Sequence, residues 1–353
     1  MREKKYLKIL IFLIMLFLII IGGTVVITDP YFHYHKPLKF LSYRFGNSRY
    51  INDGIGRYFE YDSIITGTSM TENFKSSLFD KLFNCNSIKV PFSGGSYKEI
   101  NDNLGRTLKR KDNIEYILRG LDYNKIIQNS ENMRYTNLPT YLYDDNFLND
   151  YKYLFNKEVI IKGIGGVVVY TLLGKNTTTF DEYSNWSNQY KTGKENVIKG
   201  YKRNKKENIK EEKLEKKDIE IIGENIEKNV TSLVKKYPNT KFIYFITPYS
   251  IIYWDQLKQE GKIEKQIMAE KYMIEKLLEY PNVELYSFFN NYEMICNLDN
   301  YRDPGHYMGN INDKILYWIS KKEYQLTKEN YEEYIRKNLE FFKNYDYDSI
   351  FEQ

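Results

Sequence analysis

The sequence predicts an α/β protein built on a doubly wound, mostly parallel five-stranded sheet, with a transmembrane helix ahead of it. Two observations carry this prediction. Short β-branched and aromatic runs alternate with longer segments of helical periodicity over most of the chain, and one long apolar run lies near the amino terminus. Strands that alternate with helices pair in parallel, with helices on both faces of the sheet. The 353 residues suffice for one large domain with an insertion.

The apolar run at residues 9–27 is long enough to cross a bilayer. Four basic residues precede it, and they are Arg2, Lys4, Lys5 and Lys8. Basic residues stay on the cytoplasmic side, so residues 1–8 are expected to form a cytoplasmic tail. No small-x-small cleavage site follows the run, which favours a signal anchor over a signal peptide that is removed. The main domain is then expected outside the cytoplasm, on a single-pass anchor in the cell membrane.

Residues 28–54 are interpreted as a juxtamembrane lead-in. Aromatic residues in this lead-in suit the headgroup zone of a membrane, and they are Tyr31, Phe32 and Tyr34. His33 and His35 are interpreted as interfacial residues, because two histidines without nearby cysteines or paired carboxylates make a poor metal site. Neither a metal nor a cofactor is expected for this chain.

Five segments have the length and composition of buried strands, and they are residues 61–66, 87–92, 114–118, 241–246 and 283–288. Helical spacing predicts helices at residues 72–83, 97–109, 223–237, 263–280 and 311–321. These elements define one domain over residues 55–326. A helical insertion is expected at 123–222, with a charged run at 201–217, and a helical tail at 327–353.

The net charge of +5 is mild, and lysine and glutamate are interspersed along the chain. This pattern does not give the basic stripe of a nucleic-acid-binding protein. Cys85 and Cys296 could form a disulfide outside the cytoplasm or remain two free thiols, and the sequence leaves both readings open.

Ser69 is the candidate nucleophile. It follows the strand at 61–66 and the turn residue Gly67, and it precedes the helix expected at 72–83. This places Ser69 at the carboxyl end of a strand, where the free N–H groups of a helix start could stabilise an oxyanion. The alternative is a helix N-cap, a role that serine and threonine often fill after a strand.

His306 is the candidate general base, because it is the only histidine beyond residue 35. The run Asp303-Pro304-Gly305-His306 reads as a tight turn, with proline at its second position and glycine at its third. Such a turn brings the Asp303 carboxylate to the His306 ring, which is the orienting half of a catalytic triad. The alternative is a surface turn with a solvated histidine.

Four candidate positions follow predicted strands. Ser69, the Gly94–Gly95 pair and Asp122 come after the first three strands, and His306 follows the fifth. In an open parallel sheet the carboxyl ends of the strands meet at one edge, where such folds place their sites. This convergence favours catalysis over the separate structural explanations of each motif.

The chain resembles the SGNH (GDSL-like) hydrolases over residues 55–320, and among them the membrane-anchored cell-envelope members of bacteria. The resemblance implies a flavodoxin-like SGNH fold, with Ser69 as nucleophile, His306 as base and Asp303 as its orienter. It also implies an oxyanion hole made by the N–H groups of Ser69 and of Gly94 or Gly95. The chain departs from the family at its third block, Gly120-Leu121-Asp122, where Asp122 replaces the usual asparagine donor.

The implied chemistry is acyl transfer through an acyl-serine, to water in an esterase or to a glycan hydroxyl in an O-acyltransferase. With the anchor, this favours acylated cell-envelope polysaccharide or a teichoic-acid-like polymer as substrate. Similar proteins act beside multi-pass membrane acyltransferases, so a partner of that kind is an expectation here. The alternative from another class is a non-catalytic SGNH-like module that binds a glycan or serves as an accessory to such an acyltransferase.

Overall fold

The structure is a computed structural model that describes residues 2–203 and 209–352. The chain divides into two compact units. Unit 1 contains the chain up to Phe59 together with Asn137–Tyr183, and unit 2 contains Glu60–Thr136 and the chain from Ser184 onward. The predicted boundaries at 54/55 and at 123–222 are therefore not the divisions of the fold. Only the middle of the expected insertion leaves the sheet-containing unit, and it packs with the lead-in to form a unit of its own.

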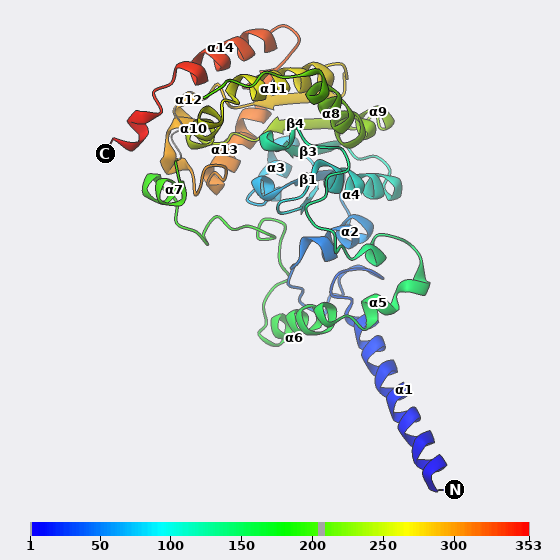
Figure 1. Cartoon of the computed structure of the whole chain (residues 1–353). Coiled ribbons are helices and arrows are strands. Elements are labelled where there is room, and N and C mark those ends of the chain that lie inside the picture. Colours follow the sequence, from blue (N-terminus) through cyan, green and yellow to red (C-terminus); the bar gives the residue numbers. More distant parts are fainter. Residues whose placement is uncertain (1, 204–208, 353) are drawn as a thin grey trace. The chain divides into compact units, whose positions relative to one another are not determined.

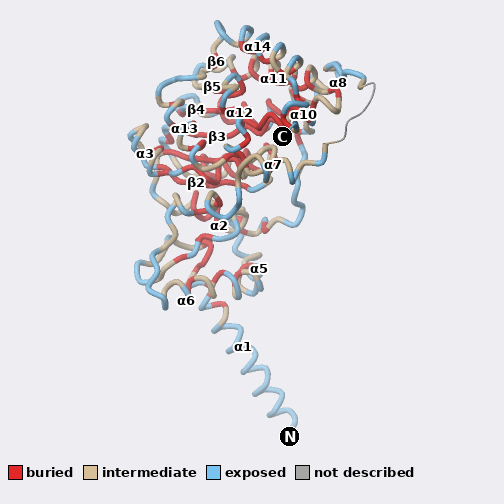
Figure 2. The backbone as a smooth tube through the Cα atoms, turned by 90° about the vertical axis from the view of Figure 1, so that its left-hand side faces the viewer, coloured by how far each residue is buried: buried red, intermediate tan, exposed pale blue. Residues whose placement is uncertain are grey.

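Unit 1 is helical in the part of the chain described. Its elements are α1 Arg2–Thr28, α2 Ser48–Tyr58, the 3-10 turns η3 Thr140–Leu142 and η4 Phe147–Asn149, α5 Tyr151–Leu154, the π-helix η5 Glu158–Ile164 and α6 Gly165–Leu172. Helix α1 contains a segment, Glu3–Thr28, that is long and apolar enough to cross a membrane. Most residues of α1 are exposed, as Figure 2 shows, so its apolar side chains have little cover from the rest of the chain.

The chain beyond α1 turns back into unit 1 around the buried carboxylate of Asp29. This carboxylate accepts hydrogen bonds from the backbone N–H groups of the three residues 33–35 and from the Tyr153 hydroxyl. Tyr31 and Phe32 are buried in the unit as a result. Both aromatic rings pack inside unit 1, and their level relative to a membrane stays a prediction. His33 is buried as well, and its ring meets the Asp150 carboxylate at 3.0 Å.

Unit 2 is built on one sheet, with the order β2-β1-β3-β4-β5-β6 among the described residues. Figure 1 labels β1, β3 and β4 of this sheet, and Figure 2 labels β2 to β6. Its strands are β1 Ser63–Gly67, β2 Ser87–Pro91, β3 Tyr116–Leu121, β4 Lys241–Ile246, β5 Val283–Ser287 and β6 Gln325–Leu326. The first five pair in parallel, in the order 2-1-3-4-5 of many doubly wound folds. The prediction of five strands misses β6, a two-residue strand that pairs antiparallel with β5 and is too short to show alternation.

Helices cover both faces of this sheet. They are α3 Ser76–Phe83, α4 Tyr97–Arg110, α7 Lys194–Gly200, α8 Lys216–Ile226, the π-helix η6 Glu227–Thr231, α9 Ser232–Lys236, α10 Ile251–Glu260, α11 Ile263–Leu277, α12 Tyr292–Cys296, α13 Gly309–Ser320 and α14 Tyr331–Asn344. Short 3-10 turns complete the unit, at η1 Ser69–Thr71, η2 Tyr123–Lys125, η7 Leu298–Asn300 and η8 Asp348–Phe351. Helix α3 packs with α13, whereas α4 packs with η6, and α11 packs with α8 and α14. In a right-handed crossover, the direction in which the chain moves along the sheet decides which face its helix covers. The chain moves in one direction from β1 to β2 and in the opposite direction from β2 to β5, so α3 is expected on one face and α4, α8 and α11 on the other.

Several predicted helices change in the structure. The helix expected at 223–237 begins earlier, at Lys216, and a π-helical stretch interrupts it at Glu227–Thr231. Helix α10 is not among the predicted helices, since its side chains lack a clear apolar stripe. The charged run at 201–217 falls partly on residues 204–208, outside the described residues.

The expected helical tail is part of the core of unit 2. Phe342 of α14 is fully buried and stacks on Trp254 of α10, with ring centroids 3.5 Å apart and planes 6° from parallel. Tyr334 of the same helix donates a hydrogen bond to the buried Glu270 carboxyl of α11. Because α14 closes the outer side of α10 and α11, we treat it as a structural helix of the domain.

We predict that Phe342→Ala lowers the free energy of unfolding by about 3–5 kcal/mol, because it removes a buried aromatic ring and leaves a cavity against Trp254. Chemical denaturation of the full chain in detergent micelles measures the change. Glu340→Ala, on an exposed position of the same helix, is the matched control and should change stability by less than about 0.5 kcal/mol. Equal effects of the two variants would show that α14 is a peripheral tail after all.

Candidate active site

The candidate nucleophile lies on a tight turn after β1. Gly67 has φ +149°, and a β-carbon there would meet the Thr71 side chain at 2.5 Å, so glycine is needed at this position. Ser69 then begins the 3-10 turn η1, and the following α-helix starts only at Ser76. The prediction of a helix from residue 72 is wrong here, because the chain makes a short turn first. The turn, and not an α-helix start, supplies the N–H groups around Ser69.

The candidate base lies on a closed loop between η7 and α13. The Asp303 carboxylate accepts the backbone N–H groups of Gly305 at 3.0 Å and His306 at 2.9 Å, which folds the loop around it. The backbone N–H of Arg302 donates to the His306 carbonyl, and Tyr301 pairs with Tyr307 as an isolated β-bridge. The tight turn expected from the sequence is therefore present, with the aspartate as its internal hydrogen-bond acceptor.

Ser69, His306 and Asp303 form one hydrogen-bonded chain. The Ser69 hydroxyl lies 2.8 Å from His306 Nε2, and His306 Nδ1 lies 2.9 Å from both carboxylate oxygens of Asp303. Tyr307 and Asn312 both donate to the Met70 carbonyl, at 3.0 and 3.1 Å, and so hold the histidine loop against the serine turn. The structure thus brings together three residues that the sequence places up to 237 positions apart.

The Asp303 carboxylate remains ionised over a wide pH range. Burial raises its pKa, but hydrogen bonds and the charge of His306 outweigh burial and hold the pKa at about 2. An ionised acceptor at Nδ1 favours the tautomer that carries its proton there. Nε2 is then free to accept the Ser69 proton, which is the arrangement a general base requires.

The backbone N–H groups expected to form an oxyanion hole differ in whether they have a protein acceptor. In the part of the chain described, the N–H groups of Ser69 and Gly94 have no protein acceptor, and both residues line the same cleft. Gly94 has φ +63°, a left-handed conformation that favours glycine. The Gly95 N–H instead donates to the Phe92 carbonyl at 2.7 Å. Gly95, the other candidate from the sequence, is therefore not an available donor in this structure.

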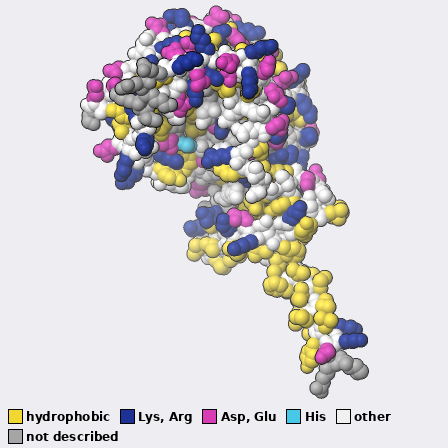
Figure 3. All heavy atoms as spheres, viewed as in Figure 1, with side chains coloured by type: hydrophobic (Ala, Val, Ile, Leu, Met, Phe, Trp, Pro, Cys, Tyr) yellow, Lys and Arg dark blue, Asp and Glu magenta, His cyan; other side chains and the backbone are white. Residues whose placement is uncertain are grey.

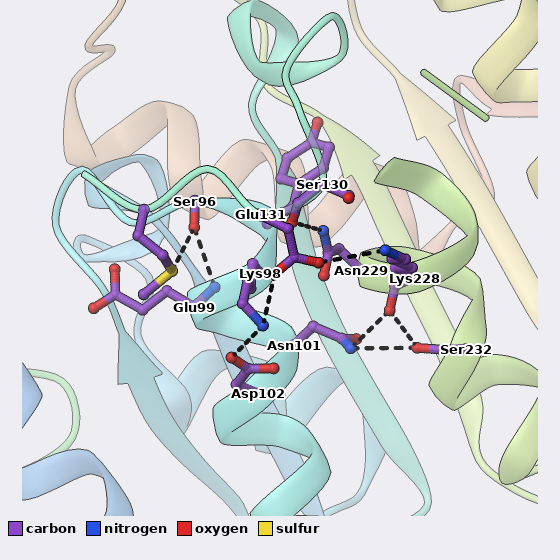
Figure 4. Close-up of polar contacts among 12 residues, drawn as sticks. Ser96, Lys98, Glu99, Asn101, Asp102, Ser130, Glu131, Lys228, Asn229 and Ser232 are labelled. Atoms are coloured by element: carbon purple, nitrogen blue, oxygen red, sulfur yellow. Dashed lines mark hydrogen bonds and ion pairs between the residues drawn. The ribbon is translucent and has the colours of Figure 1, made fainter. Parts of the chain in front are cut away.

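Arg134 covers Gly94 on the cleft side, where a β-carbon at Gly94 would meet its guanidinium. Figure 4 shows the polar network that holds the segment carrying this arginine. The Ser96 hydroxyl donates to the Met133 sulfur at 3.4 Å, and Asn229 donates to the Ser130 carbonyl at 2.7 Å. Asn101 of α4 joins the network through the Lys228 carbonyl. The segment before Arg134 is thus tied to both α4 and η6.

Asp122 lies at the carboxyl end of β3, as predicted, and its carboxylate faces the serine turn. Its Oδ1 accepts the Thr68 hydroxyl at 2.9 Å, and Lys125 Nζ lies 3.9 Å from Oδ2. Burial raises the pKa of Asp122, while Lys125 and the Thr68 hydroxyl lower it by less. Asp122 is an acceptor bound to the residue before Ser69, and it is not an oxyanion donor while ionised.

A polar cleft of about 760 Å³ opens beside the triad. Ser69, Asp303 and His306 line one part of it, together with Gly94 and Asp122. Its remaining walls include aromatic, amide and cationic side chains, among them Asn124, Lys125, Arg134, Tyr249 and Tyr253. Tyr249 and Tyr253 contact each other edge to face, and Tyr249 donates to the Asn124 amide oxygen. Such a lining suits a polar ligand, such as a sugar, more than an apolar chain.

Sequence reasoning missed an aromatic support that comes from the expected insertion. The Trp186 indole donates to the Ser69 carbonyl at 3.3 Å, and its ring meets the His306 ring edge to face. Arg302 lies over the rings of Trp186 and Tyr190 and donates to the Asp303 carboxylate at 3.2 Å. The only available signal was a tryptophan, one of three in the chain, in a polar segment.

A second missed residue is Glu72, whose buried carboxyl lies in the serine turn near His306. Burial raises its pKa to about 7, against smaller lowering effects of the His306 and Lys89 charges and of hydrogen bonds from Trp186 and Ser93. Cys85 and Cys296, whose state the sequence left open, are both free thiols.

Comparison of the chain with models of protein families, with characterised proteins and with solved structures found no match in any of the three.

We predict that the stability of the protein depends on the protonation of Glu72. Its pKa is raised on folding, from 4.5 to about 7, so its stabilising contribution is complete below pH 4.5 and is lost as pH rises through 7. Glu72→Gln cannot ionise. The free energy of unfolding of Glu72→Gln, relative to wild type, should therefore increase by about 3 kcal/mol between pH 4.5 and pH 8.

Urea unfolding of both proteins across this pH range measures the difference. Glu340→Gln, at an exposed position of α14, is the control and should track wild type at every pH. Parallel profiles for wild type and Glu72→Gln would contradict the prediction, since they would mean that Glu72 titrates as it does in the unfolded chain.

Proposed function

We propose that the chain is a membrane-anchored serine esterase or O-acyltransferase of SGNH type that acts on acylated cell-envelope polysaccharide. One observation carries the proposal. Ser69, His306 and Asp303 form a continuous hydrogen-bonded chain at the edge of a polar cleft. The order of the strands supports this class, and so do the positions along the chain of the two motifs Gly67-Thr68-Ser69-Met70-Thr71 and Asp303-Pro304-Gly305-His306.

In the proposed reaction His306 Nε2 takes the Ser69 proton as the hydroxyl oxygen attacks the acyl carbonyl carbon. The carbonyl oxygen gains the negative charge, and the N–H groups of Ser69 and Gly94 donate to it. The protonated imidazole is stabilised by the Asp303 carboxylate and then gives its proton to the leaving alkoxide. The acyl group is left as an ester on Ser69.

The second half of the proposed reaction regenerates Ser69. His306 removes a proton from the acceptor, either water or a glycan hydroxyl, whose oxygen attacks the acyl-serine carbonyl carbon. The bond between the acyl carbon and Ser69 Oγ then breaks, and Oγ takes the proton back from His306. The cleft favours a glycan or a teichoic-acid-like polymer, because its lining is largely polar and the half-buried Tyr253 borders it. Arg134 would suit an anionic part of such a polymer.

The proposed location is outside the cytoplasm, on a single-pass anchor with residues 1–8 inside. Support comes from the basic residues ahead of the apolar run and from the length of the apolar segment Glu3–Thr28. A cell-envelope acyltransferase with several membrane spans is the partner that this location would allow.

A second candidate function is a non-catalytic SGNH-like module that binds a glycan or assists a membrane acyltransferase. The observation that favours it is Asp122. The resemblance leads one to expect an asparagine donor there, and a carboxylate lines the cleft instead. Reactivity of Ser69 separates the two functions, since a binding module has no need of an activated serine.

We predict that Ser69→Ala abolishes labelling by a fluorophosphonate probe and that His306→Ala reduces it by at least about a thousandfold in rate. The double variant should be little worse than either single variant in hydrolysis of a small aryl ester, because members of a triad act together. Mass spectrometry of the labelled peptide identifies the reacting residue.

Ser187→Ala is the matched control, because the Ser187 hydroxyl is part-buried in the same unit but bonds Asn185 instead of an imidazole. It should retain wild-type labelling. A wild-type protein that neither reacts with the probe nor hydrolyses the ester would support the non-catalytic module in place of the enzyme.

We predict that Asp122→Asn does not hydrolyse the aryl ester faster than wild type. The amide oxygen can still accept the Thr68 hydroxyl, so the side chain stays turned toward that residue. Asp122→Ala should lower the free energy of unfolding by about 1–3 kcal/mol, because the buried Thr68 hydroxyl loses its acceptor. Faster hydrolysis by Asp122→Asn would show that the side chain reaches the oxyanion position.

A further inference from the structure

Unit 1 carries a helix that is apolar and yet uncovered. The π-helix η5 continues directly into α6, so residues 158–172 form one rod. Its sequence contains a single acidic and a single basic residue, Glu158 and Lys162, which pair with each other at 3.0 Å. Several of its large side chains are exposed, and with the adjoining Leu173 they are Ile161, Val168, Val169 and Leu172. Leu172 is 81% exposed. A helix with apolar side chains on both its buried and its exposed faces is expected to contact a second apolar surface, because water around the exposed side chains is unfavourable.

The same face continues onto α5, and basic residues flank it. Tyr151 and Phe155 are exposed beside the rod. Residues 151–176 contain four lysines and one acidic residue, and the lysines are Lys152, Lys157, Lys162 and Lys175. A lysine-flanked apolar face without excess acid has the composition of helices that lie in the headgroup layer of a membrane. Hydrophobic side chains gather near α1 in the same part of unit 1 in Figure 3.

Contacts with α1 fix the depth of this face. Phe155 and Leu154 lie over Gly22 of α1, and Val25 is fully buried at the same end of the helix. Gly163 lies so close to Pro30 that a β-carbon there would be only 2.8 Å from the proline ring. Gly22 is five residues before the end of the apolar run at 9–27, which corresponds to about 7 Å along a helix.

The whole apolar run is needed for the bilayer, since its 19 residues extend about 28 Å. Residues that touch Gly22 are therefore carried below the level of the headgroups. The rod of residues 158–172 is too short to cross the membrane itself, because a span needs about 20 residues. A position along the surface remains, with the exposed side chains directed at the acyl chains.

We propose that the rod at residues 158–172 and the adjoining face of α5 form a second membrane contact, which lies in the interfacial layer of the bilayer that α1 crosses. The occupant of this apolar face is lipid, and the flanking lysines contact phosphate groups. The inference rests on the anchor role proposed for α1. The proposal gives unit 1 two attachments to the membrane, α1 and the rod, so the rest of the unit cannot turn freely around the axis of α1.

Fluorescence quenching in vesicles tests the proposal with the full chain. The two free thiols are first replaced (Cys85→Ser, Cys296→Ser), and single cysteines are introduced for an environment-sensitive NBD label. The test sites are Leu172→Cys and Val169→Cys. Ile19→Cys, near the middle of the apolar run, reports the anchor, and Tyr317→Cys, a half-exposed position of α13, is the control. The vesicles contain phosphatidylcholine and phosphatidylglycerol with nitroxide groups at shallow or deep positions of the acyl chain.

The label at Leu172 should be quenched at least about twofold, more by the shallow nitroxide than by the deep one, and the deep nitroxide should quench Ile19. Tyr317 should respond to aqueous iodide and to neither lipid. If Ile19 is quenched but both test sites behave like Tyr317, the interfacial contact is wrong while the anchor stands. Protection of the test sites from lipid and iodide alike would mean that protein covers the face, which also overturns the proposal. An unquenched Ile19 would reject the anchor itself.

Discussion

The parallel order of the sheet is the constraint on which the site depends. Strand β1 lies between β2 and β3, with Gly67 opposite Pro91 and Thr66 opposite Arg119. The chain segments that leave these three strands must therefore start side by side at one edge. Ser69, Gly94 and Asp122 are distant in sequence, but each follows one of these strands within a few residues. The hydrogen bond from Thr68 to Asp122 joins two of the segments directly.

The fourth segment, with His306, needs a separate restraint, because β5 lies beyond β3 and β4 from β1. Closure of its loop around Asp303 shapes it, and the bonds from Tyr307 and Asn312 to the Met70 carbonyl attach it to the serine turn. Trp186 adds a wall on the other side, held between the Ser69 carbonyl and Arg302. The imidazole is thus positioned by groups that do not react, which is what preorganised catalysis requires.

Sequence patterns predict the elements whose conformation depends on residues that are close together in the chain. The turn at Asp303–His306 was predictable, although Gly305 does not adopt the positive φ expected of it and the Asp303 carboxylate closes the turn by hydrogen bonds. The apolar run of strand β4 predicts its observed bounds. The division into two units was not predictable, since it depends on how residues 137–183 pack with the lead-in. The role of Trp186 and the burial of Phe342 were missed for the same reason. Each depends on a partner that is distant in the sequence, and no periodicity marks it.

The electrostatics around Ser69 and His306 follow from how three nearby carboxyl groups, those of Asp303, Glu72 and Asp122, are buried. Asp303 has enough donors to remain charged despite burial, and its pKa is about 2. Glu72 and Asp122 have fewer, so burial disfavours their ionised forms and raises their pKa values. The firm negative charge therefore lies beside Nδ1 of the imidazole, where it stabilises a protonated ring. Protonation of the other two carboxyls would keep negative charge away from Ser69, where an oxyanion would otherwise meet like-charge repulsion. Burial therefore disfavours a charge at position 122, where the resemblance leads one to expect a neutral asparagine.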